Sequence, residues 1–121
     1  MTEKEIQNSI LYWLNFQPGC FAMQVTTSGV WDAKGKFYRN PGKYVPKGCA
    51  DIIFCLNGTF GAIEVKTPEA YKKFLKNPGD HELRQQAFLH QITSKGGFAQ
   101  VVCSLDQVIE AIKKLTIVHL K

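Results

Sequence analysis

Two short, mostly apolar runs lie close together near the middle of the chain, and each of them contains charged residues. The first run covers residues 50–55 and the second covers residues 61–66. Between them lie Asn57 and Gly58, the residue pair most typical of a two-residue β-hairpin turn. The pattern therefore predicts two antiparallel strands in which Leu56 faces Thr59.

The register of this hairpin brings three charged side chains to one face. Counting outward from the turn sets Asp51 directly opposite Glu64. Because side chains alternate along a strand, Lys66 shares the face of Glu64, while Ile63 and Val65 point to the other face. Two facing carboxylates, with Cβ atoms roughly 5 Å apart, destabilise a sheet unless something compensates for their repulsion.

A divalent cation would provide that compensation. Carboxylate oxygens suit Mg²⁺ or Mn²⁺, and Mg²⁺ is typically held by one or two carboxylates together with waters and substrate phosphates. The alternative is that Asp51 and Glu64 lie at strand ends, where they are solvated or paired with lysines. The convergence of both carboxylates and Lys66 on one face favours the metal site.

The chain begins with an amphipathic helix, which Thr2 and Glu5 open as a capping box. Its apolar stripe consists of Ile6, Ile10 and Leu14. Glu3 lies on the same stripe and is expected to face inward. Its carboxylate is therefore either a third metal ligand or a partner for the positive end of the helix dipole.

A second helix is expected to run from a cap at Asp80 to about Lys95. Its apolar face is predicted to consist of Leu83, Ala87, Phe88 and Ile92. Gln85 lies three residues before Phe88, so its amide points toward the rim of the core. Periodicity alone favours an ordinary helix-end glutamine bonded to backbone over a functional group.

The remaining elements complete a single α/β (α+β) domain over residues 1–121. They are strands over residues 21–27 and 98–103, a partly helical segment or flap over residues 69–79, and a helix that starts at a capping box, Ser104 to Gln107. The closing helix should bury Val108, Ile109, Ile112 and Leu115. Residues 117–120 are expected to form an edge strand or an interface segment. The expected order is α-β-β-β-α-β-α.

The chain carries 15 Lys and Arg against 10 Asp and Glu, and this net charge of +5 favours an anionic partner. Much of the excess lies in a Gly- and Pro-punctuated segment over residues 28–48. Between residues 34 and 47 this segment has no acidic residue. Its basic residues are Lys34, Lys36, Arg39, Lys43 and Lys47. This segment suits contact with a phosphate backbone, unless it is simply a solvated loop. Lys72 and Lys73 add further candidate DNA contacts.

The cysteines show neither a disulfide framework nor a zinc-binding spacing, and we expect reduced core residues at Cys20, Cys49, Cys55 and Cys103. Spacing alone leaves a Cys/His nucleophilic pair open, but no motif surrounds His81, His90 or His119. No stretch is long or apolar enough to span a membrane or to serve as a secretory signal. A cytoplasmic protein is expected, with no membrane partner and no small-molecule cofactor.

Together these motifs resemble the PD-(D/E)XK nucleases and, among them, the stand-alone virus-type replication-repair nuclease (VRR-NUC) domains of phages and prophages. The matching residues span nearly the whole chain: Glu3-x-x-Ile6-Gln7, Gly48-Cys49-Ala50-Asp51, Ile63-Glu64-Val65-Lys66, Gln85-x-x-Phe88, and Gly96-Gly97 followed by Val101-Val102-x-Ser104. Ala50 stands where a proline often precedes the aspartate. That departure changes backbone stiffness and leaves the ligand chemistry intact.

The resemblance implies a restriction-endonuclease-like three-layer fold with a central mixed β-sheet flanked by helices. It also implies hydrolysis of DNA phosphodiester bonds with Mg²⁺ or Mn²⁺, the ion being held by Asp51, Glu64, the backbone carbonyl of Val65 and Glu3. Lys66 would position the attacking water or stabilise the negative transition state. Gln85 resembles the family's helix glutamine, which orients that lysine or a phosphate.

Stand-alone members of this type resemble Holliday-junction resolvases, which act as homodimers with one active site on each of two strands. The expected function is therefore a structure-selective endonuclease for four-way or other branched DNA, in the cytoplasm of a bacterial host. Two alternatives stay open: a sequence-specific or flap-type nuclease of the same superfamily, and a non-catalytic DNA-binding module with this fold. Intact Asp51, Glu64 and Lys66 argue against the second alternative.

Overall fold

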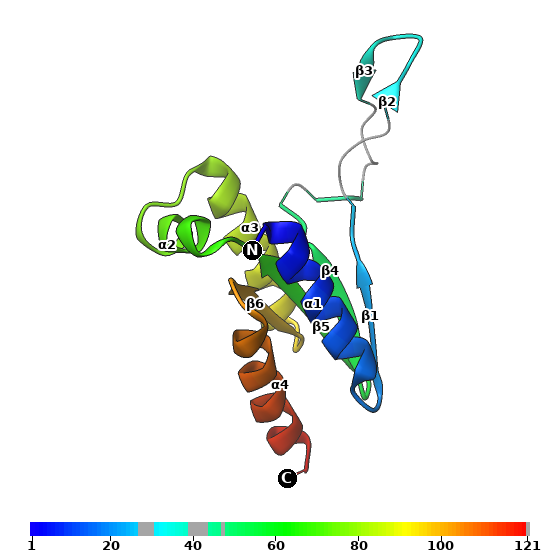
Figure 1. Cartoon of the computed structure of the whole chain (residues 1–121), viewed down its shortest axis with the longest axis vertical. Helices are drawn as coiled ribbons and strands as arrows, with labels where there is room; N and C mark the ends of the chain where they lie inside the picture. The colour runs from blue at the N-terminus through cyan, green and yellow to red at the C-terminus, as the bar shows by residue number, and fades with distance from the viewer. Residues whose placement is uncertain (27–30, 39–43, 47, 121) are drawn as a thin grey trace.

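The computed structural model of the chain describes residues 1–26, 31–38, 44–46 and 48–120. They form an α+β fold built on a mixed four-stranded sheet (Figure 1). In chain order the elements are α1 (Glu3–Phe16), β1 (Cys20–Gln24), β2 (Trp31–Asp32), β3 (Phe37–Tyr38), β4 (Ile52–Leu56), β5 (Thr59–Val65), α2 (Pro68–Lys76), α3 (Asp80–Ser94), β6 (Phe98–Val102) and α4 (Leu105–Leu120).

The strand order in the main sheet is β1-β4-β5-β6, with antiparallel pairs on one side and a parallel pair between β5 and β6. The predicted hairpin is confirmed, because Leu56 pairs with Thr59 across the turn. Asn57 and Gly58 have φ angles of 49° and 87°, the positive values that this tight turn requires. β2 and β3 form a separate small hairpin, which the sequence did not predict.

Helices cover both faces of the sheet. On one face, α1 packs on β1 and β5, and α4 packs on β6 and α1. Their apolar stripes join a core that includes Ile10, Leu14, Ile52, Val65 and Val108. On the opposite face, α3 lies over β5 and β6, and its Gln85 reaches Glu64 of β5. The functional side chains predicted from the hairpin therefore lie beneath α3 and not in the apolar core.

The first predicted capping box is confirmed, because the side chains of Thr2 and Glu5 each accept a hydrogen bond from the other's backbone N–H, at 3.1 Å. The second box is altered. The Ser104 hydroxyl accepts from the N–H of Gln107 at 3.3 Å, but the Gln107 amide accepts from Cys103 at 2.6 Å instead of from Ser104. That bond ties α4 to the residue directly after β6.

The predicted cap and apolar face of α3 are partly wrong. Gly79 is the N-cap, and Asp80 is the first helical residue, where its charge complements the helix dipole. Leu83 is 49% exposed and Ala87 is also exposed, whereas Gln85 is buried. The reason is that α3 covers the strand face that carries Glu64, so its inward side is partly polar.

The last helix extends further than expected. Residues 117–120 continue α4 and are not an edge strand. Val108 and Ile112 are buried as predicted, while Ile109 and Leu115 are half-buried. The segment over residues 69–79 is helical from Pro68 to Lys76. No helix within the described residues has the length and apolarity needed to cross a membrane.

The four cysteines are free, as expected, but none of them is fully buried, and Cys20 alone is among the half-buried residues that pack against the core cluster. Cys55 is exposed, and Cys20, Cys49 and Cys103 are half-buried. Alternation explains the exposed thiol, because β4 buries Phe54 and Leu56 and turns Cys55 to the other face.

The free edge of β1 is closed by a side chain of α1. The Asn15 amide donates to the carbonyl of Ala22 at 3.1 Å, and its oxygen accepts from the N–H of Ala22 at 2.8 Å. Both outward backbone groups at the centre of this edge strand are therefore already bonded.

Candidate active site

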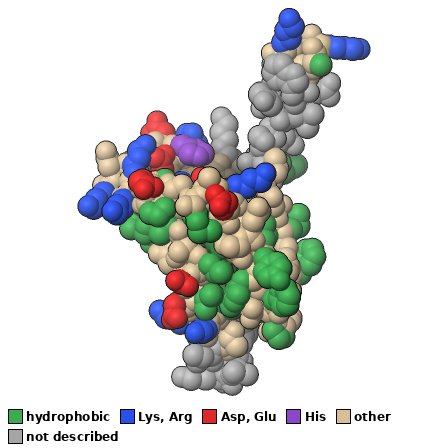
Figure 2. Space-filling model, viewed as in Figure 1, with side chains coloured by type: hydrophobic (Ala, Val, Ile, Leu, Met, Phe, Trp, Pro, Cys, Tyr) green, Lys and Arg blue, Asp and Glu red, His purple; other side chains and the backbone are tan. Residues whose placement is uncertain are grey.

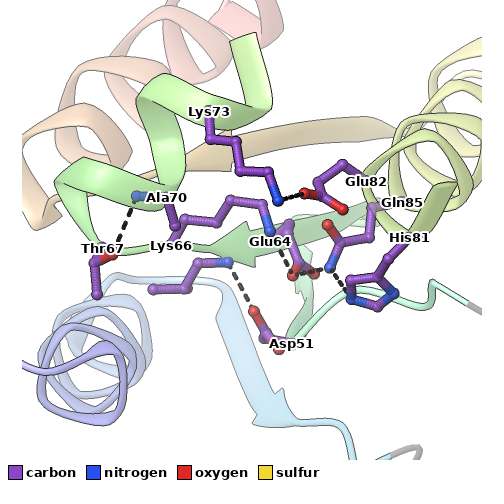
Figure 3. Close-up of polar contacts among 10 residues, drawn as sticks. Asp51, Glu64, Lys66, Thr67, Ala70, Lys73, His81, Glu82 and Gln85 are labelled. Atoms are coloured by element: carbon purple, nitrogen blue, oxygen red, sulfur yellow. Dashed lines mark hydrogen bonds and ion pairs between the residues drawn. The ribbon is translucent and has the colours of Figure 1, made fainter. Parts of the chain in front are cut away.

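The predicted hairpin register brings the three central charged residues together (Figure 3). Asp51 directly precedes β4, Glu64 lies in β5, and Lys66 directly follows β5. The Asp51 carboxylate accepts a hydrogen bond from the N–H of Val65 at 2.8 Å. The Lys66 ammonium lies 4.0 Å from Glu64 Oε1. The Asp51 bond therefore links the start of β4 to β5, whereas the ion pair joins two residues of the β5 segment that share one face.

Burial sets the electrostatics of this cluster. Glu64 is 4% exposed and Lys66 is 9% exposed, while Asp51 is half-buried. Desolvation, reinforced by the nearby Asp51, raises the pKa of Glu64 to about 8, although Lys66 opposes the shift. Desolvation also raises the pKa of Asp51, against the opposing effect of the Val65 N–H bond. The single ammonium does not offset the cost of two buried carboxylates.

Two polar atoms at the centre of the site lack partners. Glu64 Oε2 and Gln85 Oε1 are buried and have no hydrogen-bond partner among the described residues. Buried polar atoms are almost always bonded, so these two oxygens call for a further partner, such as a water molecule or an ion. Carboxylate and amide oxygens are ligands of hard divalent cations, and this donor set fits Mg²⁺ or Mn²⁺.

Gln85 holds Glu64 in place. Its Nε2 donates to Glu64 Oε1 at 2.6 Å and also lies 3.2 Å from His81 Nε2. Figure 3 shows both side chains reaching from α3 toward the carboxylates. Because the amide nitrogen is held between these neighbours, the Gln85 oxygen is turned to the other side, toward the end of Lys66 in Figure 3.

His81 is a site residue that the sequence analysis missed. Its charge lowers the pKa of Asp51, so it lies within electrostatic reach of that carboxylate. The available signal was its spacing of four residues from Gln85, which places both side chains on one helix face.

Glu3 occupies a less central position than expected. Its side chain is exposed, so the prediction that it faces inward is wrong; the buried stripe of α1 begins one turn later, at Ile6. Desolvation and Asp51 nevertheless raise the pKa of Glu3, and Lys66 lowers it. The described residues contain no group of three His, Cys, Asp or Glu side chains close enough to hold one ion.

The helix α2 forms a second boundary of the site. The ring of Phe74 lies 5.3 Å from the Lys66 ammonium. Lys73, a candidate DNA contact, pairs with Glu82 of α3 at 3.1 Å. Phe74 and Glu82 had no sequence signal for a role here, because their positions depend on how α2 packs beside α3.

The other candidate DNA contacts are spread over the surface. Lys34 and Lys36 are exposed at the turn between β2 and β3, where Asp32 accepts bonds from the N–H groups of Lys34 and Gly35. This hairpin stands apart from the body of the molecule, with basic side chains at its tip (Figures 1 and 2). Lys72 is exposed on α2. Arg39, Lys43 and Lys47 lie outside the described residues.

Comparison with known proteins adds no relative whose function bears on this site. No protein-family model, curated protein or solved structure matches the chain at a significant level.

Proposed function

We propose that this chain is a divalent-metal-dependent DNA endonuclease with a PD-(D/E)XK active site of the VRR-NUC type. Asp51, Glu64 and the backbone carbonyl of Val65 would hold the ion, and Glu3 would reach it through water. The observation that carries this proposal is the pairing of Asp51 with a buried Glu64, whose pKa is raised and whose Oε2 has no hydrogen-bond partner among the described residues.

The electrostatic cost of the site supports a cation. A protein rarely keeps two carboxyl groups and an unpartnered oxygen buried together unless a ligand stabilises them. A divalent ion would favour the ionised form of both groups and would occupy the unpartnered oxygen. When bound to such an ion, water becomes a nucleophile at neutral pH and phosphate oxygens lose part of their charge.

The side chains around the carboxylates have separate tasks in this proposal. The N–H of Val65 orients Asp51, and the amide of Gln85 orients Glu64. The Lys66 ammonium, held at the same face, would stabilise the negative charge that develops on the phosphate in the transition state. The unpartnered Gln85 oxygen would receive a hydrogen bond from the attacking water or from Lys66.

DNA is the substrate that the charge distribution favours. The chain has a net charge of +5, and exposed lysines lie on the β2–β3 hairpin and on α2. Phosphate contacts of this kind fix a position on nucleic acid without reading its bases, which suits recognition of branched DNA by shape. A homodimer would place one site on each of two strands, as two symmetric cuts require.

A cleavage assay tests this function directly. Labelled four-way junction, flap and linear duplex are incubated with protein in Mg²⁺, Mn²⁺ or EDTA. We expect metal-dependent cleavage of the junction, lost in EDTA and in Asp51→Ala, and retained in Asp106→Ala, which removes an exposed carboxylate of α4. Lys66→Ala should lose cleavage about 100-fold or more while keeping junction binding in Ca²⁺.

Each result of the panel decides between the alternatives. Equal cleavage by the wild type and Asp51→Ala would refute the proposed mechanism. Preferential cutting of flaps, or of one sequence in linear duplex, would keep the nuclease and replace the branched-junction substrate. Binding without cleavage in any metal would leave only the DNA-binding module.

A further inference from the structure

Lys66 is enclosed between a carboxylate and an aromatic ring. Its ammonium lies 4.0 Å from Glu64 Oε1 and 5.3 Å from the centre of the Phe74 ring. The whole Lys66 residue is only 9% exposed, and Phe74 is 4% exposed. A lysine normally keeps its ammonium in water. Burial of this ammonium therefore costs solvation free energy, which contacts with the protein must offset.

The position of the ring is fixed by the way α2 is built. The Thr67 hydroxyl accepts from the N–H of Ala70 at 3.3 Å, and Pro68 starts the helix directly after that cap. Phe74 is the buried residue of α2, whereas its neighbour Leu75 is 60% exposed. The helix therefore turns one aromatic side chain inward, onto the lysine that precedes it.

Contacts with α3 hold α2 at this angle. Lys73 pairs with Glu82 at 3.1 Å, and the Gln86 amide donates to the backbone carbonyl of Phe74 at 3.5 Å. Lys73 directly precedes Phe74 in the chain, and the second contact involves the backbone of Phe74 itself. Because α3 also carries Gln85, one helix supports both groups that surround the Glu64–Lys66 pair.

We propose that Phe74 is a positioning residue that holds the Lys66 ammonium at the reactive face. The negative face of an aromatic ring attracts a cation, and the attraction is stronger where water is excluded. Ring and carboxylate together would hold the end of a flexible four-carbon side chain at one point. The effect on cleavage rests on the proposed nuclease function, whereas the contact itself can be measured without it.

Ring fluorination tests this role without changing the shape of the side chain. Phe74 is replaced by phenylalanines with one, three and five ring fluorines, which weaken the negative potential of the ring face stepwise and finally reverse it. We expect cleavage to fall stepwise to about one tenth of the wild-type rate, while DNA binding in Ca²⁺ stays unchanged and each variant remains folded at the assay temperature. Leu75→Ala, which alters an exposed side chain of the same helix, should cleave at the wild-type rate.

A spectroscopic signal reports the contact independently of activity. Protons on the Lys66 ε-carbon that lie over an aromatic ring are shielded, and their NMR signal should return to the ordinary lysine position in Phe74→Leu. A wild-type signal at the ordinary position would overturn the contact. Unchanged cleavage along the fluorine series would overturn the positioning role, whereas absence of cleavage by the wild type itself would refute the proposed nuclease.

Discussion

The carboxyl group of Glu64 lies in surroundings that oppose its negative charge. Burial and Asp51 raise its pKa from 4.5 to about 8, so the folded chain without metal favours the protonated form. In the unfolded chain the carboxyl group of Glu64 keeps its ordinary pKa of 4.5 and is ionised at neutral pH. Stabilisation from this group is therefore complete below pH 4.5 and is lost as the pH rises through 8.

This shift predicts a measurable change in stability. In EDTA, the free energy of unfolding should fall between about pH 5 and pH 8, by up to about 1.4 kcal/mol per pH unit from this one group. Glu64→Gln should remove that part of the slope, and Glu110→Gln, at an exposed glutamate, should keep it. Urea unfolding at a series of pH values measures the slope. Equal slopes for the wild type and Glu64→Gln would contradict the prediction.

Local periodicity was enough to predict that some of the site residues lie close together, but it did not predict the others. Asp51, Glu64 and Lys66 followed from one turn and the period of two along a strand, both of which are local properties. His81 and Phe74 contact the site only because α2 and α3 pack around the end of β5. The spacing of four residues places His81 on the same helix face as Gln85, but no spacing within α2 or α3 specifies how these helices pack on β5.

The ion pair between α2 and α3 lowers the positive charge that is free for contacts at the surface of α2. Lys73 is a candidate phosphate contact, yet its ammonium is paired with Glu82 at 3.1 Å. A phosphate would have to compete with this carboxylate for the lysine. The pair therefore reduces the positive potential at the surface of α2.

Removing the carboxylate should release that lysine. We expect Glu82→Gln to bind DNA about two- to threefold more tightly at low salt, with a plot of log affinity against log salt that is steeper by about one unit. Fluorescence anisotropy over a range of salt concentrations measures both quantities. Glu110→Gln makes the same change in net charge on α4 and serves as the control. An unchanged slope would show that Lys73 makes no contact with phosphate.

At the level of elements, turn and capping signals located the hairpin and α1 correctly because those signals act within a few residues. The apolar face of α3 was less predictable, since the strand below it carries Glu64 as well as apolar side chains. Residues 117–120 include β-branched side chains that favour a strand, but α4 is already formed and continues through them. Tertiary context therefore overrode local preference in α3, whereas continuation of a helix that had already begun did so in α4.

Over the whole molecule, basic side chains reach furthest from the sheet at the β2–β3 hairpin (Figure 2). We expect the double variant Lys34→Ala, Lys36→Ala to lose DNA affinity equally for all sequences and to reduce the salt slope by about two units. Its melting temperature should not change, because both side chains are exposed. Lys113→Ala, Lys114→Ala on α4 is the charge-matched control. Equal affinity losses for the two double variants would indicate a general charge effect and not a hairpin contact.

The Asn15 bridge to Ala22 limits how two molecules can associate through the β1 side. An uncovered strand edge recruits extended segments from neighbouring chains and is a common start of fibrous aggregation. Here the main-chain groups at the centre of that edge are already engaged. Two copies that meet on this side would have to interlock by their side chains, and they could then part again without breaking any main-chain bond at that point.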